Sequence, residues 1–419
     1  MKASHRRWAL LPCAAIAVAL VAAGCSTDEG DSASDATPDE SVLGATNQAT
    51  GEPVPIVFQT TGEQGIAYTQ ETKVAEATVA YINDHLGGIN GRPLALTVCE
   101  DKAQVSLARE CANEAVASDA VAVISGDPSN PDTTTAVTSP AGMLFLDSSG
   151  GGQPTLGSPH TAVLNNSLSG LVGVPAYYAK ENGIDKVAIL TMDAPIATGP
   201  IKAIGPMAFG NAGVEMDLIA VPLGTPDVTP QIQAALDNGD GMFHVLGNES
   251  FCATAFKAMR TLNVDAPVTT VSQCIGNSDV ASQIPGGYEG IKVSQSRSLD
   301  PEAEETKVFE AVLAKYGAEG AEDGAAAYQS LIAFQRALEG MTGEVDRGSV
   351  AAQVTGMPEP KVLPLKAGGE FECGSRPVAI APNICSEASL LGTAEEDGTV
   401  VDVETIDIGP LFTPPRGLR

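Results

Sequence analysis

The stretch from Pro55 to Asp101 constrains the fold of this chain more than any other part of the sequence. It begins with a short apolar run, Ile56 to Phe58, which a polar loop follows. Apolar or small residues then recur at helical spacing across residues 75–82, so one face of a helix is expected to be buried. A glycine turn separates this helix from a second apolar run, Leu94 to Val98. The stretch therefore predicts one βαβ unit, which builds a parallel sheet through a right-handed crossover.

Apolar runs and amphipathic segments alternate along most of the remaining chain. The predicted strands cover residues 121–124, 143–146, 186–192, 214–221, 242–246, 268–271 and 291–294, and the predicted helices cover 105–116, 168–182, 201–211, 228–237, 250–262, 302–316 and 324–339, with another helix beginning at 133–137. No internal repeat of roughly 20 to 50 residues interrupts this order. The alternation predicts an α/β fold with parallel sheets flanked by helices.

Residues 362–412 differ from the rest of the chain. They are rich in Gly, Pro and short apolar runs, which predict β-hairpins or irregular strands. We therefore expect a C-terminal extension of different character from the α/β part.

Length and charge limit what the chain can do. Its 419 residues are enough for two cores and two domains. Its 52 acidic and 23 basic residues give a formal net charge of −29. We expect no nucleic acid partner, because no basic stripe is available to displace counterions.

The first 25 residues have the features of an export signal. Three basic residues precede an apolar run, residues 8–22, that is too short to span a membrane comfortably as a mature helix. The sequence Ala22-Ala23-Gly24-Cys25 resembles the lipobox of bacterial lipoproteins, with Ala22 at the place of the usual leucine. This resemblance implies that Cys25 is diacylated and holds the protein on a membrane surface. An ordinary signal peptide with an incidental Cys25 is the alternative.

Residues 26–53 predict a disordered acidic tether. They contain seven acidic residues, no Lys or Arg and little hydrophobic content. Such a segment would give the folded part of the chain reach from the membrane surface.

Six cysteines follow residue 25, and an even number in an exported chain indicates disulfides. Many pairings are open to six cysteines, but close spacing in the chain favours Cys99–Cys111, Cys252–Cys274 and Cys373–Cys385. A zinc site is the alternative, although no C-x-x-C occurs and the histidines at 85, 160 and 244 are far apart in sequence. We expect three disulfides, no metal and no cofactor.

Several phrases of the sequence resemble the leucine/isoleucine/valine-binding family of transporter receptors, which has the type I periplasmic-binding fold. The most specific phrase is Gly87-Gly88-Ile89-Asn90-Gly91-Arg92-Pro93. The other matching phrases lie at residues 56–68, 80–83, 121–129, 148–154, 186–190 and 324–328. The resemblance covers about residues 54–345.

This resemblance implies two α/β lobes, joined by three crossing segments, that close over a ligand by a hinge motion. The first lobe would hold residues 54–174 and 298–344, and the second 175–297 and 345–412, leaving a tail at 413–419. It further implies a monomeric receptor on the outer face of a bacterial cell membrane. Such a receptor would bind a small polar solute, a branched-chain amino acid or a related compound, and deliver it to the permease of an ABC importer. A lipoprotein that senses an amide or an amino acid and signals to a membrane partner is the alternative.

The resemblance also implies a site at strand ends, where family members hold a carboxylate with hydroxyl and backbone N–H groups. Ser129 and the loop of Ser149 to Gly152 match such positions, with Gly151 or Gly152 at the place of the usual hydroxyl. Glu249 falls where the family's ammonium-binding acid lies, although an acid before a helix also serves as a cap. The full set of candidate ligand-binding residues is Thr61, Gln64, Tyr68, Asp127, Ser129, Ser149, Gly150, Gly151, Asp193, Glu249 and Gln273.

Some of these candidates have simpler interpretations. Asp127 and Gln273 end strands, where local turn chemistry accounts for polar residues. Gly150 to Gly152 can serve as a turn that needs positive φ. Asp193 lacks the aromatic residue that often follows it in the family, which weakens the assignment of an amino acid as the ligand.

An enzymatic function finds little support in the sequence. It contains no G-x-S-x-G elbow, no P-loop, no H-E-x-x-H and no G-x-G-x-x-G. A Ser–His–Asp set could still assemble in space. We expect a binding protein and not an enzyme.

Overall fold

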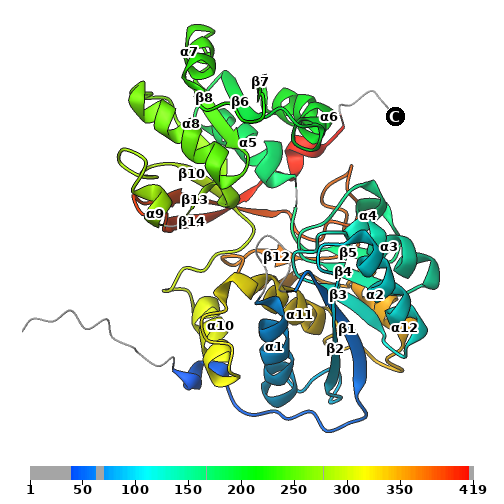
Figure 1. The fold of residues 1–419 in the computed structure, drawn as a ribbon. Helices are drawn as coiled ribbons and strands as arrows, with labels where there is room; N and C mark the ends of the chain where they lie inside the picture. The colour runs from blue at the N-terminus through cyan, green and yellow to red at the C-terminus, as the bar shows by residue number, and fades with distance from the viewer. Residues whose placement is uncertain (1–38, 63–69, 167, 277, 415–419) are drawn as a thin grey trace, which may run out of the picture. The chain divides into compact units, whose positions relative to one another are not determined.

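The computed structural model describes residues 39–62, 70–166, 168–276 and 278–414 (Figure 1). Its elements form two main sheets with helices against them, so the α/β class predicted from the sequence is confirmed. Each sheet has its own buried core. The predicted signal peptide, Cys25 and most of the predicted tether lie outside the described residues.

The first sheet has five parallel strands in the order β2-β1-β3-β4-β5. Its strands are β1 (Val54–Thr60), β2 (Leu94–Glu100), β3 (Ala122–Ser125), β4 (Leu144–Asp147) and β5 (Thr161–Val163). The helices that belong with it are α1 (Glu71–His85), α2 (Val105–Ala117), α3 (Pro131–Thr138), α4 (Gln153–Gly157), α10 (Glu304–Lys315), α11 (Ala325–Ala337) and α12 (Arg347–Thr355).

The second sheet has seven strands in the order β14-β13-β10-β9-β8-β6-β7. Parallel pairing joins β6 (Lys186–Met192), β7 (Glu215–Val221), β8 (Met242–Leu246), β9 (Val268–Val271) and β10 (Lys292–Gln295). An antiparallel hairpin of β13 (Ala388–Ala394) and β14 (Val400–Asp407) completes the sheet. The remaining helices of this part are α5 (Val174–Glu181), α6 (Pro195–Ala212), α7 (Thr229–Asp237), α8 (Glu249–Thr261) and α9 (Ser278–Ala281).

The opening βαβ unit forms as predicted. Strands β1 and β2 pair in parallel from Val54 and Leu94 onward, and α1 buries Val74, Ala75 and Ile82 between them and α11. The glycine-rich phrase after α1 makes a tight turn with positive φ at Gly87, Gly88, Asn90 and Gly91. A side chain at position 88 would meet the carbonyl oxygen of Arg92, so glycine is required there.

Residues 39–53 differ from the predicted disordered tether. Residues 40–43 form a short 3₁₀ helix whose Leu43 side chain is only 3% exposed in the first core. The backbone N–H groups of Asn47 and Ala49 donate to carbonyls at the end of α1. The burial of Leu43 and hydrogen bonds to α1 and the turn after it therefore order a segment whose composition alone indicates disorder.

The structure also differs from the predicted division of the chain after residue 344. Helix α12, which the sequence analysis missed, packs against β3, β4 and β5 through Val350, Ala351 and Val354. Residues 347–373 therefore belong with the first sheet, and only the later part of the extension joins the second. The extension does contain hairpins, since β11 (Lys361–Val362) pairs antiparallel with β12 (Glu370–Phe371), as β13 does with β14.

The three disulfides have the predicted pairing. Cys99–Cys111 joins β2 to α2, Cys252–Cys274 joins α8 to the turn after β9, and Cys373–Cys385 closes a loop of the extension. Residues 383–385 of that loop lie along β5, where Cys385 donates its backbone N–H to the carbonyl of Val163. Each bond closes a short loop, which removes entropy from the unfolded chain worth about 3 kcal/mol.

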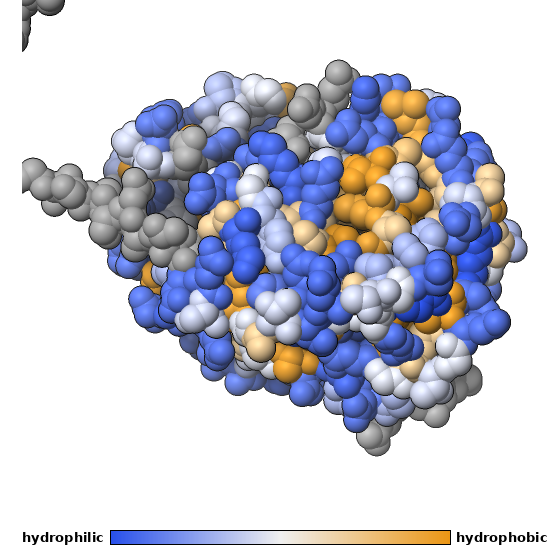
Figure 2. All heavy atoms as spheres, turned by 90° about the horizontal axis from the view of Figure 1, so that it is seen from below, coloured by the Kyte–Doolittle hydropathy of each residue, from blue (hydrophilic) through white to orange (hydrophobic). Residues whose placement is uncertain are grey.

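Among the described residues, few large hydrophobic side chains are exposed: Val105, Leu223, Leu299 and Val362. Figure 2 shows one face, on which hydrophobic residues gather in one area among hydrophilic neighbours. Within the described ranges, every helix is too short or too polar to cross a membrane.

Candidate functional site

A cavity of about 240 Å³ lies where three parallel strands of the second sheet end. Strands β8, β9 and β10 contribute Leu246, Val271 and Gln295 to its wall. Ligands of parallel α/β sheets bind outside the carboxyl ends of strands, which makes this cavity the first candidate for a binding site. The full lining is Ser149, Asn165, Asn166, Ser169, Gly170, Leu171, Leu246, Val271, Ser272, Gln273, Ser294, Gln295 and Ser296.

The described part of the cavity wall is polar but uncharged. Hydroxyl and amide side chains dominate the lining, and Leu171, Leu246 and Val271 supply an apolar part. The Nδ2 atom of Asn166 and the Oε1 atom of Gln295 are buried without a hydrogen-bond partner among the described residues. Asn166 is only 4% exposed, so its free donor is costly unless something else satisfies it.

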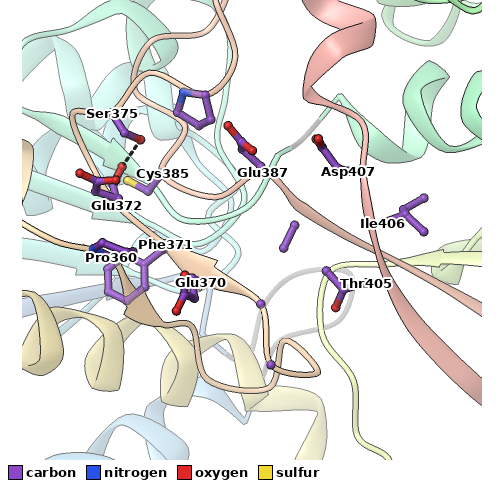
Figure 3. Close-up of a pocket in the computed structure, with 14 residues that line it drawn as sticks. Pro360, Glu370, Phe371, Glu372, Ser375, Cys385, Glu387, Thr405, Ile406 and Asp407 are labelled. Atoms are coloured by element: carbon purple, nitrogen blue, oxygen red, sulfur yellow. Dashed lines mark hydrogen bonds between the residues drawn. The ribbon is translucent and has the colours of Figure 1, made fainter.

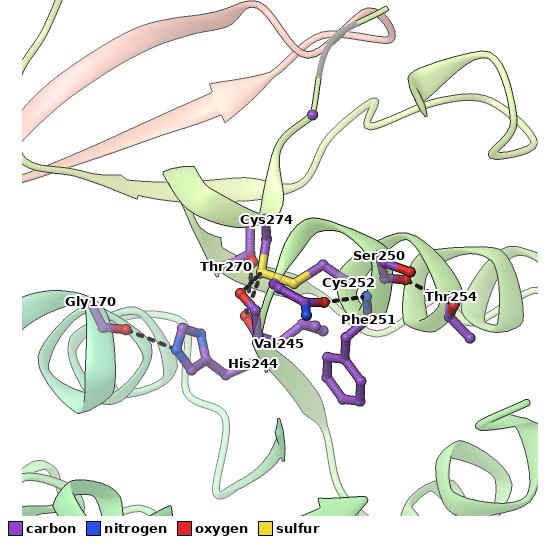
Figure 4. The surroundings of a disulfide bond; sticks show 12 residues. Gly170, His244, Val245, Ser250, Phe251, Cys252, Thr254, Thr270 and Cys274 are labelled. Atoms are coloured by element: carbon purple, nitrogen blue, oxygen red, sulfur yellow. Dashed lines mark hydrogen bonds between the residues drawn. A yellow bond between two sulfur atoms is a disulfide. The ribbon is translucent and has the colours of Figure 1, made fainter. Parts of the chain in front are cut away.

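A buried histidine supports one side of this cavity. His244 Nε2 lies 3.0 Å from the carbonyl oxygen of Gly170 (Figure 4), and Nδ1 lies 2.8 Å from Thr269 Oγ1. Since a carbonyl only accepts, Nε2 carries the proton and Nδ1 accepts from the threonine hydroxyl. Burial lowers the pKa of His244 to about 4, so the ring is neutral. The neutral ring holds the π-turn of residues 169–173 against the second sheet.

The Cys252–Cys274 disulfide fixes another part of the wall. Cys274 directly follows the lining residues Ser272 and Gln273, and Cys252 lies in the first turn of α8 (Figure 4). The side chain of Asn248 caps this helix by accepting the N–H of Phe251 at 3.0 Å. Cap and disulfide together anchor the turn that carries Gln273.

A group of charged residues gathers where β1, β3 and β4 of the first sheet end. The carboxyl of Glu71, at the start of α1, accepts hydrogen bonds from Thr60 Oγ1 at 2.6 Å and from the backbone N–H of Asp127 at 2.9 Å. Burial, followed by the charge of Asp127, raises the pKa of Glu71 to about 7. This carboxyl therefore holds a proton in mildly acidic solution.

Arg297 joins this group from the segment that follows β10. Its Nη2 donates to Asp127 Oδ2 at 2.6 Å, and its Nη1 donates to Ser148 Oγ at 3.0 Å. Next to Ser148, burial raises the pKa of Asp147 well above its usual range. The two oxygens of Asp147 accept backbone N–H bonds from Ser149 and Gly150, which oppose that rise.

Lys366 reaches the same region from the loop between β11 and β12. Its side chain is only 1% exposed, and Nζ donates to Asn165 Oδ1 at 2.7 Å and to the carbonyl of Ser296 at 2.9 Å. Burial, followed by the charge of Arg297, lowers the pKa of Lys366 to about 7. Both hydrogen-bond acceptors of Lys366 belong to residues that line the cavity.

Of the predicted ligand-binding residues that the structure describes, two line the cavity, Ser149 and Gln273. Asp127 instead pairs with Arg297, close to the cavity wall. Gly150 donates its N–H to Asp147, and Gly151 lies against Pro131 and Asp132, where a side chain would not fit.

Other predicted residues lie apart from this cavity. Thr61 is buried after β1, Ser129 is exposed before α3, and Asp193 is exposed before α6. Glu249 is exposed in the first turn of α8, and its carboxyl lies against Gly276, outside the cavity lining. Gln64 and Tyr68 lie outside the described residues.

The sequence analysis missed most of the described residues around the cavity, among them Asn165, Asn166, Arg297 and Lys366. Asn165 and Asn166 follow β5, a strand of three residues that the sequence did not reveal. Arg297 comes two residues after the end of β10. It would have been a candidate if the sequence analysis had included residues up to three positions beyond each predicted strand, because the predicted strand there covers residues 291–294. Lys366 lies in the irregular extension, and no local signal marks it.

A larger cavity of about 530 Å³ lies in the C-terminal extension (Figure 3). Four acidic residues contribute to its lining: Glu370, Glu372, Glu387 and Asp407. It is bordered by the two hairpins of the extension and not by ends of parallel strands. No group of three or more metal-ligating side chains occurs in the described part of the chain, so these acids do not form a metal site there.

Parallel sheets with a cavity at their carboxyl ends define an α/β ligand-binding protein. The family described as periplasmic binding protein matches residues 53–378. The chain belongs to this family, which confirms the resemblance seen in its sequence. A search of curated proteins found no match.

Solved structures with the same fold include several substrate-binding proteins. An ABC transporter substrate-binding protein from Desulfitobacterium hafniense, in complex with Leu, is 18% identical, with a TM-score of 0.65 over 85% of this chain and 100% of that one. The branched-chain amino acid transporter substrate binding protein LivJ from Streptococcus pneumoniae, in complex with isoleucine, is 19% identical, with a TM-score of 0.61 over 85% and 100%. A solute binding protein of an ABC transporter from Rhodopseudomonas palustris, in complex with p-hydroxybenzoic acid, is 18% identical, with a TM-score of 0.62 over 88% and 99%. At this identity the likeness concerns the fold.

Proposed function

We propose that this protein is the extracytoplasmic solute-binding receptor of an ABC importer. The observation that carries the proposal is the 240 Å³ cavity at the ends of β8, β9 and β10, lined by hydroxyls, amides and a few apolar side chains. In a member of the periplasmic binding protein family, such a cavity suits a small polar solute. Closure of two lobes by a hinge would bury the solute, and the closed form would deliver it to a membrane permease.

The chemistry of the wall limits the class of solute. Ser149, Gln273 and Gln295 can exchange hydrogen bonds with polar groups, while Leu171 and Leu246 favour an apolar portion. The related proteins described above hold leucine, isoleucine or p-hydroxybenzoic acid, each of which combines a carboxyl group with an apolar portion. We therefore propose a small solute of mixed polarity as the cargo.

Lipid attachment at Cys25 would place the receptor on the outer face of the bacterial membrane, as a monomer beside its permease. The basic start, the apolar run and the Ala22–Cys25 sequence support this location. A sensor with the same fold and the same anchor is the second candidate, although the anchor and tether favour delivery to a permease. Copurification with a permease favours import, whereas copurification with a membrane kinase favours sensing.

Thermal unfolding in the presence of small solutes tests the function. A panel of amino acids, amides, ureas and small carboxylates should include at least one compound that stabilises the protein. A solute at about one hundred times its Kd adds about 2.7 kcal/mol to the free energy of unfolding. If no small solute raises the unfolding temperature, the receptor function is wrong.

A pair of glutamine variants then places the solute in the cavity. Gln273→Ala removes a lining amide and should weaken binding about 10-fold, as expected for one lost hydrogen bond. Gln233→Ala removes an exposed amide of α7 and serves as the control. Equal affinity of the two variants would exclude Gln273 from the site.

A further inference from the structure

Two cations stand directly behind the polar wall of the cavity. Lys366 Nζ donates to the Asn165 side chain and the Ser296 backbone, and both of these residues line the cavity. Arg297 follows Ser296 and donates to Ser148, the neighbour of lining residue Ser149. The chain has a net charge of −29, so two cations at this place stand out from its acidic surroundings.

The backbone around Lys366 is held in an unfavourable conformation. Its neighbours Leu365 and Ala367 have φ of 54° and 49°, a left-handed region that such residues rarely adopt. Strain of this kind persists only where surrounding contacts over-determine the structure. Gln329 supplies such contacts, because its Nε2 donates to the Pro364 carbonyl at 2.7 Å while its Oε1 accepts from Asn165 at 2.8 Å.

Four of the described acidic residues face Lys366 and Arg297. Asp127 is paired with Arg297 at 2.6 Å, so the charges of these two residues offset each other. Burial raises the pKa of Glu71 to about 7 and that of Asp147 well above its usual range, which favours their uncharged forms. Burial raises the pKa of Glu305, which also faces the loop, while the charge of Arg336 and the backbone N–H groups of Leu365 and Lys366 oppose that rise.

None of the described residues that line the cavity is anionic. An α-ammonium group in it would lose its water without gaining a carboxylate partner from this described lining, whose side chains are all uncharged. A carboxylate would instead meet hydroxyl and amide donors backed by positive charge. This arrangement favours an anion over a zwitterion.

We infer that the solute of this cavity is a small organic monoanion, a carboxylate without an ammonium group, and that Lys366 supplies the positive charge that selects it. The inference rests on the proposed function and names its substrate class. Lys366 acts through Asn165 and Ser296 and is therefore a positioning residue. A merely structural role for Lys366, as a brace between chain segments, is the competing explanation.

Matched ligands separate the two explanations. The probes are 4-methylpentanoate, its amide and leucine, which share one carbon skeleton, together with 4-hydroxybenzoate and 4-hydroxybenzamide. Calorimetry gives the Kd of each probe for the wild type, for Lys366→Met and for the control Lys361→Met. Lys361 lies in the same extension, where it pairs with the exposed Glu359.

We expect at least one acid to bind the wild type 10-fold or more tightly than its amide and than the corresponding amino acid. Lys366→Met should remove most of that preference, about 10-fold, because a unit charge has left the surroundings of the anion. Lys361→Met should leave the preference unchanged. A loss of affinity that is equal for acid and amide would show that Lys366 is only a brace.

The pH dependence of the wild type provides a test that needs no folded Lys366 variant. A bound anion favours charged Lys366, so binding of the acid should take up a proton, and affinity should fall as pH rises from 6.5 to 8.5. Proton uptake is measured by calorimetry in buffers of different ionisation enthalpy. The amide should show neither effect, and Glu71→Gln should retain both. Binding of the acid without proton uptake would contradict the inference.

The binding measurements distinguish an error in this inference from an error in the proposed receptor function. Tighter binding of leucine than of 4-methylpentanoate, or equal binding of acids and amides, overturns the charge selection and leaves the receptor function intact. The same holds if none of the acids binds while another solute does. If no solute of any class binds, the receptor function fails as well.

Discussion

Replacement of Glu71 by glutamine should make the protein more stable at alkaline pH. Glu71 is buried at the start of α1, where its carboxyl accepts bonds from Thr60 and from the backbone of Asp127. Burial raises its pKa from 4.5 to about 7. A glutamine has nearly the same shape and stays uncharged, so its oxygen can accept the Asp127 N–H while its amide donates to Thr60.

The magnitude and sign follow from the pKa of Glu71 in the two states. The folded state binds the proton more tightly than the unfolded state, so this contribution to stability is complete below pH 4.5 and is lost as pH rises through 7. The difference between 4.5 and about 7 corresponds to about 3 kcal/mol in the free energy of unfolding. Relative to the wild type, Glu71→Gln should therefore gain about 3 kcal/mol between pH 4.5 and pH 8.

Urea unfolding of wild type and variant at both pH values measures this change, with the disulfides kept intact. Glu76→Gln serves as the control, because Glu76 is exposed on the same helix. The difference between each variant and the wild type cancels the titration of all other groups. If Glu71→Gln gains no stability on going to pH 8, or gains no more than the control, the carboxyl is not held uncharged in the folded protein.

Two further predictions concern the walls of the cavity. Burial lowers the pKa of His244 to about 4, so the free energy of unfolding should fall by about 3 kcal/mol as the pH drops from 6.5 to 4. Urea unfolding of His244→Gln should show a smaller fall over the same pH range. An equal fall in the variant and the wild type would contradict a buried neutral ring. Glu249→Ala should leave solute affinity within about 2-fold of the wild type in calorimetry, because the Glu249 carboxyl lies against Gly276 and outside the cavity lining. A loss of affinity of 10-fold or more would show that Glu249 contacts the solute.

The sequence predicted those parts of the fold best that depend on residues close to one another in the chain. The βαβ unit at Pro55–Asp101 and the order of later strands follow from the spacing of apolar residues, which the chain carries in short windows. The disulfide pairing also followed from closeness in sequence, because each pair bridges adjacent elements. Helix α12 was missed because its nine residues bury only Val350, Ala351 and Val354, which is too few for a periodic signal.

The candidate site was less predictable because its charges come from distant parts of the chain. Ser149 and Gln273 follow predicted strands, and the rule that ligands bind at strand ends found both. Lys366 lies about 200 residues from Asn165, and nothing near it in sequence marks it as buried. Glu249 has the right residue type, but its position in the first turn of α8 directs it to the helix terminus and the neighbouring loop.

The position of α12 has a consequence for how the protein folds. Its first residue, Arg347, donates to the carbonyl of Ala120, across 227 positions of the chain. Helix α12 therefore cannot pack against the first sheet until the five parallel strands of the second sheet, β6 to β10, have been synthesised. Such high contact order slows folding. The disulfides span only 12, 22 and 12 positions, so they can form while these distant contacts are still unmade.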